Sequence, residues 1–142
     1  MSDEPEKPPD GGPWVSKRHT FRPHEHLRRP ADFKRVYDRR RSVSDELLIL
    51  YAAPNDLPHN RLGLSVSRKF GGAVQRNRLR RLFREAYRLT RHHMPTGLDL
   101  ILIPRSKAEP PLAELLAALP KLVGQAARKL ARDASPPPEA LP

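Results

Sequence analysis

The sequence predicts an α+β fold in which helices pack on one sheet. Three short apolar segments have the length of buried strands, and three longer segments repeat their apolar residues at helical spacing. In chain order they read helix, strand, strand, helix, strand, helix, with room for one further short strand. The chain has 142 residues, which is enough for one domain with a single hydrophobic core.

The first half of the fold begins with a helix at Pro30, because proline suits the first turn of a helix. Its apolar face, at spacing i, i+3 and i+4, holds Phe33, Val36 and Tyr37. Residues 47–53 follow as an apolar run of strand length. Residues 61–67 alternate like a half-buried strand. The apolar side of that strand holds Leu62, Leu64 and Val66.

The central helix is predicted over residues 73–92, after Gly71 and Gly72 break the chain. One arc of this helix is apolar and holds Leu79, Leu82, Phe83, Ala86 and Tyr87. The adjoining arc carries Asn77 and a stripe of bases formed by Arg76, Arg80, Arg84, Arg88 and Arg91. We therefore expect one side of the helix to pack in the core and the next to present guanidinium groups.

The folded region ends with a buried strand over residues 98–103 and an amphipathic helix over residues 111–132. Pro120 lies inside this helix and is expected to kink or interrupt it. Residues 1–16 and 133–142 are rich in proline and too poor in apolar residues to offset the entropy of ordering. We therefore predict two disordered tails around a domain at residues 17–132.

Positive charge is concentrated in two blocks of the chain. The whole chain has 27 Lys and Arg against 16 Asp and Glu, a net charge of +11. Residues 17–41 hold ten bases and three acids, and residues 61–93 hold ten bases and a single acid, Glu85. Like charges on one helix repel, so the ratio of ten bases to one acid in residues 61–93 indicates a polyanionic partner rather than a merely solvated face. Arginine suits phosphate because its guanidinium donates parallel N–H bonds.

Composition and motifs exclude several classes of function. The chain has no Cys, which rules out disulfides, thiolate metal sites and Cys nucleophiles. No apolar run approaches the ~20 residues of a membrane span, and the N-terminus does not have the pattern of a signal peptide. The six His are scattered, and no carboxylates are paired as in a two-metal nuclease. We expect a cytoplasmic protein with no membrane partner, no catalytic residue and no metal site of its own.

The aromatic residues near the N-terminus allow two interpretations. Phe33 and Tyr37, with Tyr51 on the first strand, are spaced like ordinary core residues. The same helix carries Arg35 and is followed by arginines at 39–41, and aromatic faces beside bases form a platform for single-stranded nucleic acid. The residues by themselves favour the core interpretation.

The most specific motif lies in residues 61–88. It comprises Arg61-Leu-Gly-Leu-Ser-Val-Ser-Arg-Lys69, Gly71, Ala73-Val74, Arg76-Asn77-Arg78, Arg80-Arg81 and Arg84-Glu85. Through this motif the chain closely resembles the protein subunit of bacterial ribonuclease P. The resemblance extends over roughly residues 21–132 and leaves out the proline-rich ends.

The resemblance implies a fold and a function. The fold is a two-layer α/β sandwich with one mixed sheet and a left-handed β-α-β crossover, against the usual right-handed rule. The enzyme removes the 5′ leader of precursor tRNA by metal-dependent hydrolysis, and its RNA subunit holds the active site and the Mg²⁺. The expected partners are therefore the ribonuclease P RNA and precursor tRNA, and no protein partner is evident.

The resemblance also assigns residues to two RNA-binding sites. The catalytic RNA is expected to contact the basic turn and the central helix at Arg68, Lys69, Arg76, Asn77, Arg78, Arg80, Arg81 and Arg84. The single-stranded leader is expected in a cleft between the first helix and the sheet, at Phe33, Tyr37, Tyr51, Arg61 and Ser65. This assignment favours the stacking interpretation of the three aromatic residues over the core interpretation.

Three alternative functions fit less of the sequence. A structural RNA-binding protein of the ribosomal type shares the charge and the length but not the Arg-Asn-Arg motif and the aromatic residues. A DNA-binding regulator would need a helix-turn-helix, whereas a strand precedes the central helix. A self-sufficient nuclease would need clustered carboxylates, which the sequence lacks.

Overall fold

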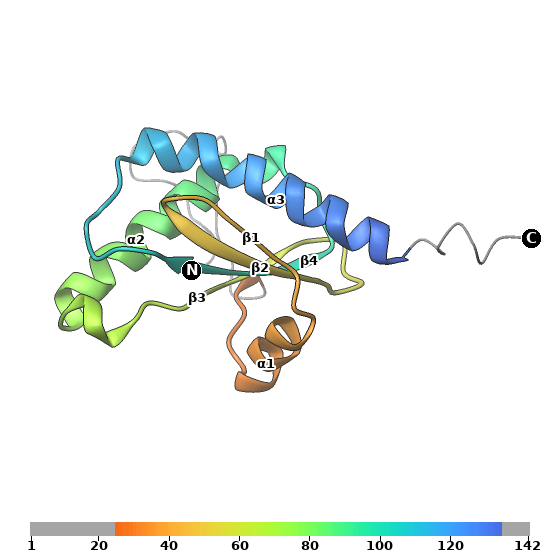
Figure 1. The fold of residues 1–142 in the computed structure, drawn as a ribbon, viewed down its shortest axis with the longest axis horizontal. Coiled ribbons are helices and arrows are strands. Elements are labelled where there is room, and N and C mark those ends of the chain that lie inside the picture. Colours follow the sequence, from red (N-terminus) through yellow and green to blue (C-terminus); the bar gives the residue numbers. More distant parts are fainter. Residues whose placement is uncertain (1–24, 135–142) are drawn as a thin grey trace, which may run out of the picture.

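The computed structural model describes residues 25–134, which form one mixed sheet with helices on both faces (Figure 1). The predicted tail at residues 1–16 lies outside this range, as do residues 135–142. The elements in chain order are α1 (Pro30–Asp38), β1 (Ser42–Ser44), β2 (Leu48–Pro54), β3 (Arg61–Leu64), η3 (Arg68–Phe70), α2 (Ala73–Thr90), η4 (Arg91–His93), β4 (Leu98–Pro104) and α3 (Leu112–Ala134). The predicted α+β class and element order are confirmed.

The four strands lie in the order β1-β2-β4-β3. Strand β2 is antiparallel to both β1 and β4, whereas β3 and β4 are parallel. Strand β1 is the additional short strand for which the sequence left room. Strand β3 ends at Leu64, earlier than predicted, although the Ser65 N–H still donates to the Leu102 carbonyl at 3.0 Å.

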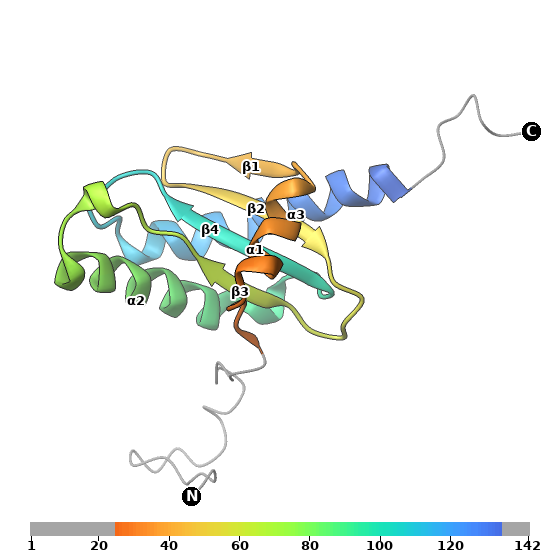
Figure 2. The ribbon, with the colours of Figure 1, turned by 90° about the horizontal axis from the view of Figure 1, so that it is seen from below.

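The connection from β3 through α2 to β4 has the rare left hand. Figure 2 views the sheet from the α1 side, with α2 and α3 on the far side. When β3 and β4 are turned to point upwards in that view, β4 lies to the right of β3 while α2 lies behind the sheet. A right-handed crossover with this strand order would place the helix in front. The crossover implied by the resemblance is therefore present.

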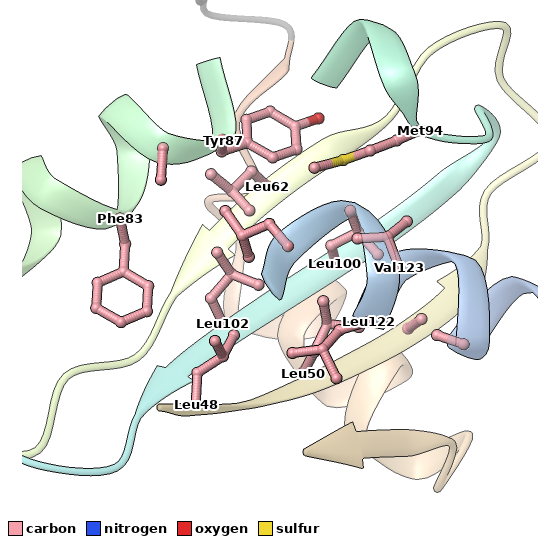
Figure 3. Close-up of a cluster of buried hydrophobic side chains, with 14 of the residues drawn as sticks. Leu48, Leu50, Leu62, Phe83, Tyr87, Met94, Leu100, Leu102, Leu122 and Val123 are labelled. Carbon is pink, nitrogen blue, oxygen red and sulfur yellow. The ribbon is translucent and has the colours of Figure 1, made fainter. Parts of the chain in front are cut away.

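The main core lies between the sheet and the pair α2 and α3 (Figure 3). The strands contribute fully buried leucines, and α2 contributes the apolar arc predicted from its periodicity. Phe83 is completely buried and Tyr87 is 2% exposed, which confirms both as core residues. Helix α1 covers part of the opposite face of the sheet and forms a second, smaller apolar cluster there.

Helix α3 differs from the prediction at two points. It runs without interruption from Leu112 to Ala134, so Pro120 does not break it. The helix carries buried residues on both sides of the proline, namely Leu115, Leu119, Leu122, Val123, Ala126 and Leu130. Burial of both halves outweighs the ~3 kcal/mol that an internal proline costs. The helix also extends two residues beyond the predicted domain end at 132, where Asp133 accepts hydrogen bonds from Arg41.

A buried carboxylate connects α1 to the sheet. Asp99 of β4 is 0% exposed, and it accepts two hydrogen bonds from Arg61 of β3, at 2.9 Å from Nε and 2.7 Å from Nη2. The Asn55 amide donates a third bond at 2.9 Å. Arg35 of α1 completes the set by donating to the same carboxylate. Buried charges are tolerated only when they are paired and hydrogen-bonded, and here the pairing joins a helix and two strands.

We predict that Asp99→Asn lowers the free energy of unfolding by about 3 kcal/mol, because it leaves Arg35 without its counter-charge and Arg61 with only the more distant Asp32, at 3.8 Å. Urea unfolding followed by circular dichroism measures this loss. Asp38→Asn is the matched control, since Asp38 is exposed and, among residues 25–134, pairs only with Lys34 at 2.7 Å. An exposed pair of this kind contributes about 0–1 kcal/mol. Equal small losses in both variants would contradict the role given to Asp99.

Candidate nucleic-acid interface

Helix α2 presents the bases that the sequence assigned to its polar side. Its apolar side is buried against the main core through Leu79 and Phe83. This orientation leaves Asn77 and Arg78 exposed, together with Arg81 and Arg84, whereas Arg76 and Arg80 are half-buried. We call this set, with Arg68 and Lys69 of η3, the basic surface.

The turn before α2 is built to expose its bases. The Ser67 side chain accepts a hydrogen bond from the Lys69 N–H at 3.3 Å, which fixes the start of η3. Gly71 then takes a φ of +126°, a conformation that residues with a side chain rarely adopt. The chain thereby turns into α2 with Arg68 and Lys69 both exposed.

Acids do not neutralise the basic surface within the described residues. Arg80 Nη1 donates to the Asn77 side chain at 2.8 Å, and Arg76 Nε donates to the Gly71 carbonyl at 3.2 Å. These contacts restrain the side chains without cancelling their charge. The C-terminal end of the stripe differs, because Arg88 pairs with Glu85 at 2.6 Å and Arg91 pairs with Glu25 at 2.7 Å. Glu85 is therefore a salt-bridge partner of α2.

The three aromatic residues assigned to the leader come together on the α1 face of the sheet. Phe33, Tyr37 and Tyr51 are each half-buried and pack beside the smaller apolar cluster. The rings of Tyr37 and Tyr51 meet edge to face, with centroids 5.0 Å apart and an interplanar angle of 79°. A Cβ on Gly63 would lie 2.5 Å from Phe33 Cζ, so the Phe33 ring rests on the bare backbone of β3. We call these three residues the aromatic site.

The other two residues assigned to the leader, Arg61 and Ser65, are not part of the aromatic site. The Arg61 guanidinium is held by Asp99, and this hydrogen bonding raises the pKa of Arg61 above its ordinary value. Its side chain is 24% exposed. Ser65 lies just past the end of β3 and is half-buried. The leader role of both residues stays a prediction, and Arg61 has a structural role that the sequence did not indicate.

A hollow of about 390 Å³ joins the basic surface to the aromatic site. Phe33 and Gly63 line one side of it, and Arg80 and Arg84 line another. Sequence reasoning missed two further lining residues, His26 and Arg28. Their segment runs beside β3, where the Leu27 N–H donates to the Leu62 carbonyl at 2.8 Å. The only signal for them in the sequence was the basic character of residues 17–41.

Residues 25–134 offer neither a metal cluster nor a membrane-spanning helix. No three His, Asp or Glu side chains of this region come together in a way that could hold a metal ion. None of the helices in the same region combines the length and apolarity needed to cross a bilayer.

Comparisons with known proteins agree on one family. The family model described as Ribonuclease P matches residues 21–127. The chain is 38% identical over 98 residues to the ribonuclease P protein component of Caldanaerobacter subterraneus, an alignment that covers 68% of this chain and 84% of that protein. It is 45% identical over 83 residues to the same component of Clostridium botulinum, covering 58% and 75% of the two chains.

Solved structures show the same similarity. The ribonuclease P protein from Thermotoga maritima aligns with a TM-score of 0.65 and 31% identity, over 71% of this chain and 96% of that one. The ribonuclease P protein of Staphylococcus aureus aligns with a TM-score of 0.62 and 32% identity, over 72% and 94% of the two chains.

Proposed function

Because this chain belongs to the family of bacterial ribonuclease P protein components, we propose that it binds the catalytic RNA and the 5′ leader of precursor tRNA at once. The observation that carries the proposal is the hollow in which Phe33 of the aromatic site faces Arg80 and Arg84 of the basic surface. Two surfaces of different chemistry meet there on one rigid fold. Such an arrangement suits two RNA segments that must lie side by side.

The basic surface is the proposed contact for the catalytic RNA. Its bases extend from the one long helix α2 and from the capped turn η3, so the backbone sets the order in which they meet an RNA. Arginine donates to two phosphate oxygens at once, which favours a structured RNA backbone over free counterions. The absence of acidic partners for these bases within residues 25–134 leaves their charge available to phosphate.

The aromatic site is the proposed contact for the leader. Stacking requires an accessible ring face, and all three residues are only partly buried and lie outside the main core. The bases of a single strand are free to stack on such rings, whereas paired bases are not. Mature tRNA has no leader, so this site gives the precursor an advantage over the product.

The contribution of this chain to the reaction is proposed to be electrostatic and positional. Its cations reduce the repulsion between two RNA molecules, and its aromatic site holds the leader in place. Mg²⁺ supplies the Lewis-acid chemistry of phosphodiester hydrolysis and is proposed to be held by the RNA.

Reconstitution with the cognate catalytic RNA tests the proposed function. We expect the protein to lower the Mg²⁺ concentration at which the RNA cleaves precursor tRNA, because its bases replace part of the counterion screening. Cleavage is measured across a Mg²⁺ titration with and without protein, and protein without RNA is the control. Metal-dependent cleavage by RNA-free protein, or an unchanged Mg²⁺ requirement, would refute the proposal.

The basic surface is tested by Arg78→Ala combined with Arg84→Ala, two exposed residues. Binding to the catalytic RNA should weaken, and the slope of log K against log salt should flatten by about 1.5, since each lost phosphate contact removes ~0.7–0.9. Filter binding over a salt series measures both quantities. Lys121→Ala with Arg132→Ala, two exposed bases of α3, removes the same charge outside this surface and should leave the slope unchanged. If the arginine variant has the same salt slope as the unmodified protein, α2 is not part of the interface with the catalytic RNA.

The aromatic site is tested by Phe33→Leu combined with Tyr37→Leu, which keeps apolar contact with the smaller cluster but removes the stacking faces. Loss of one stacked base is worth ~1–3 kcal/mol, so we expect the holoenzyme to bind precursor tRNA at least about fivefold more weakly. Affinity for mature tRNA should not change. Urea unfolding controls for stability. Equal losses for precursor and mature tRNA would restore the core interpretation of these residues.

A further inference from the structure

A second group of bases lies at the β1 edge of the sheet, away from the basic surface. The turn after α1, the strand β1 and the last turns of α3 meet there (Figure 2). We call the bases of these elements the basic edge, which consists of Arg39, Arg40, Arg41, Arg128, Lys129 and Arg132.

Among the acids of residues 25–134, Asp133 is the one that pairs with a residue of the basic edge. Asp133 accepts two hydrogen bonds from Arg41, at 2.6 Å from Nε and 2.5 Å from Nη2. These bonds, with the charges of Arg39 and Arg132, hold the pKa of the Asp133 carboxyl below its ordinary value. A single carboxylate therefore lies within reach of three arginines. Lys129 donates to the Ser42 carbonyl at 3.0 Å rather than to an acid.

The basic edge surrounds a hollow of about 320 Å³. Val43 and Ser44 of β1 form one wall, and the side chains of α3 form the other, namely Gln125, Arg128, Lys129 and Arg132. Within residues 25–134 strand β1 pairs only with β2, so it forms an open edge of the sheet beside this hollow. Cations and an amide together suit a ribose-phosphate chain more than an apolar ligand.

The basic edge begins one strand away from the aromatic site, although its hollow lies around the β1 edge, on the α3 face of the sheet. Ser42 of β1 lies directly opposite Tyr51 of β2 in the sheet, and neighbouring strands are ~4.8 Å apart. Tyr37, whose ring contacts Tyr51, is followed closely in the chain by Arg39. A strand of RNA that leaves Tyr37 and Tyr51 towards β1 therefore meets the basic edge first.

The same topology separates the basic edge from the proposed catalytic RNA. The hollow that contains Arg80 and Arg84 lies beside β3, and β3 and β1 are the two opposite edges of the sheet. An RNA held by α2 has no need to reach across the sheet, whereas a leader that crosses Tyr51 is already next to β1.

We propose that the basic edge is a second binding site for single-stranded RNA, which holds the phosphates of the leader upstream of the nucleotides stacked on the aromatic site. The proposal rests on the proposed function, because it needs a leader at Tyr37 and Tyr51. Contacts to phosphate carry no base information, so this site recognises the length of the leader and not its sequence. Precursors with long leaders gain affinity from it, and precursors with short leaders do not.

The test uses the reconstituted holoenzyme and precursors whose unstructured uridine leaders lengthen one nucleotide at a time. Arg128→Ala with Arg132→Ala removes two exposed bases of the edge. For long leaders we expect affinity to fall about fivefold and the salt slope to flatten by ~1.4, the value for two phosphates of a single strand. For the shortest leaders and for mature tRNA, affinity should equal that of the unmodified holoenzyme.

Controls separate this proposal from the proposed function. Lys107→Ala with Lys121→Ala removes equal charge elsewhere and should not alter the dependence of affinity on leader length. Arg128→Lys with Arg132→Lys keeps the charge of the basic edge and should retain that dependence. An unchanged length dependence in the alanine variant, or an equal loss for all leaders and for mature tRNA, would overturn the proposal. Failure of the proposed function looks different, because unmodified holoenzyme would then bind precursor and mature tRNA alike.

Discussion

The carboxylate of Asp99 is the point on which the RNA-facing side of this protein depends. It is fully buried, and it is shared by Arg61 of β3 and Arg35 of α1. Helix α1 otherwise rests on the sheet through a small apolar cluster, far smaller than the core beneath α2 and α3. Replacement of a buried ion pair by apolar residues is often neutral for stability, whereas removal of one partner is not. The pair therefore matters less for overall stability than for fixing where α1, with Phe33 and Tyr37, lies on the sheet.

The arginines divide into those that the fold uses and those that it leaves to RNA. Arg35, Arg61, Arg88 and Arg91 each pair with an acid, and those pairs join elements or neutralise the end of α2. The basic surface pairs with none of the acids in residues 25–134, and the basic edge encloses one. The net charge of the whole sequence does not distinguish these groups. Which arginines remain available to phosphate depends on where a few carboxylates lie, chiefly those of Glu85, Asp99 and Asp133.

The sequence predicted the elements well because their periodicity reflects burial on one side, as the leucines of β2, β4 and α2 show. It did not decide whether Pro120 kinks or interrupts α3, because the penalty of Pro120 is local whereas the packing that offsets it is tertiary. The Asp99 hydrogen-bond network could not be predicted either, because Arg61 and Arg35 lie 38 and 64 residues from Asp99 along the chain. Most of the predicted site residues come together as two groups, and Arg61 and Ser65 belong to neither. The hollow between the groups, with Arg28 in its lining, depends on how the segment before α1 lies along β3.

The hand of the β3-α2-β4 connection decides which side of the sheet remains open. With the strand order β1-β2-β4-β3, a right-handed connection would have carried α2 over the face that α1 now shares with the aromatic site. Phe33, Tyr37 and Tyr51 would then lie under α2 as well as α1, with no open side for a base. The uncommon chirality thus keeps the main core and the aromatic site on opposite faces of one sheet, while α2 carries both core residues and the basic surface. Substitutions among the core residues of the strands and of α3 can therefore accumulate without altering the aromatic site.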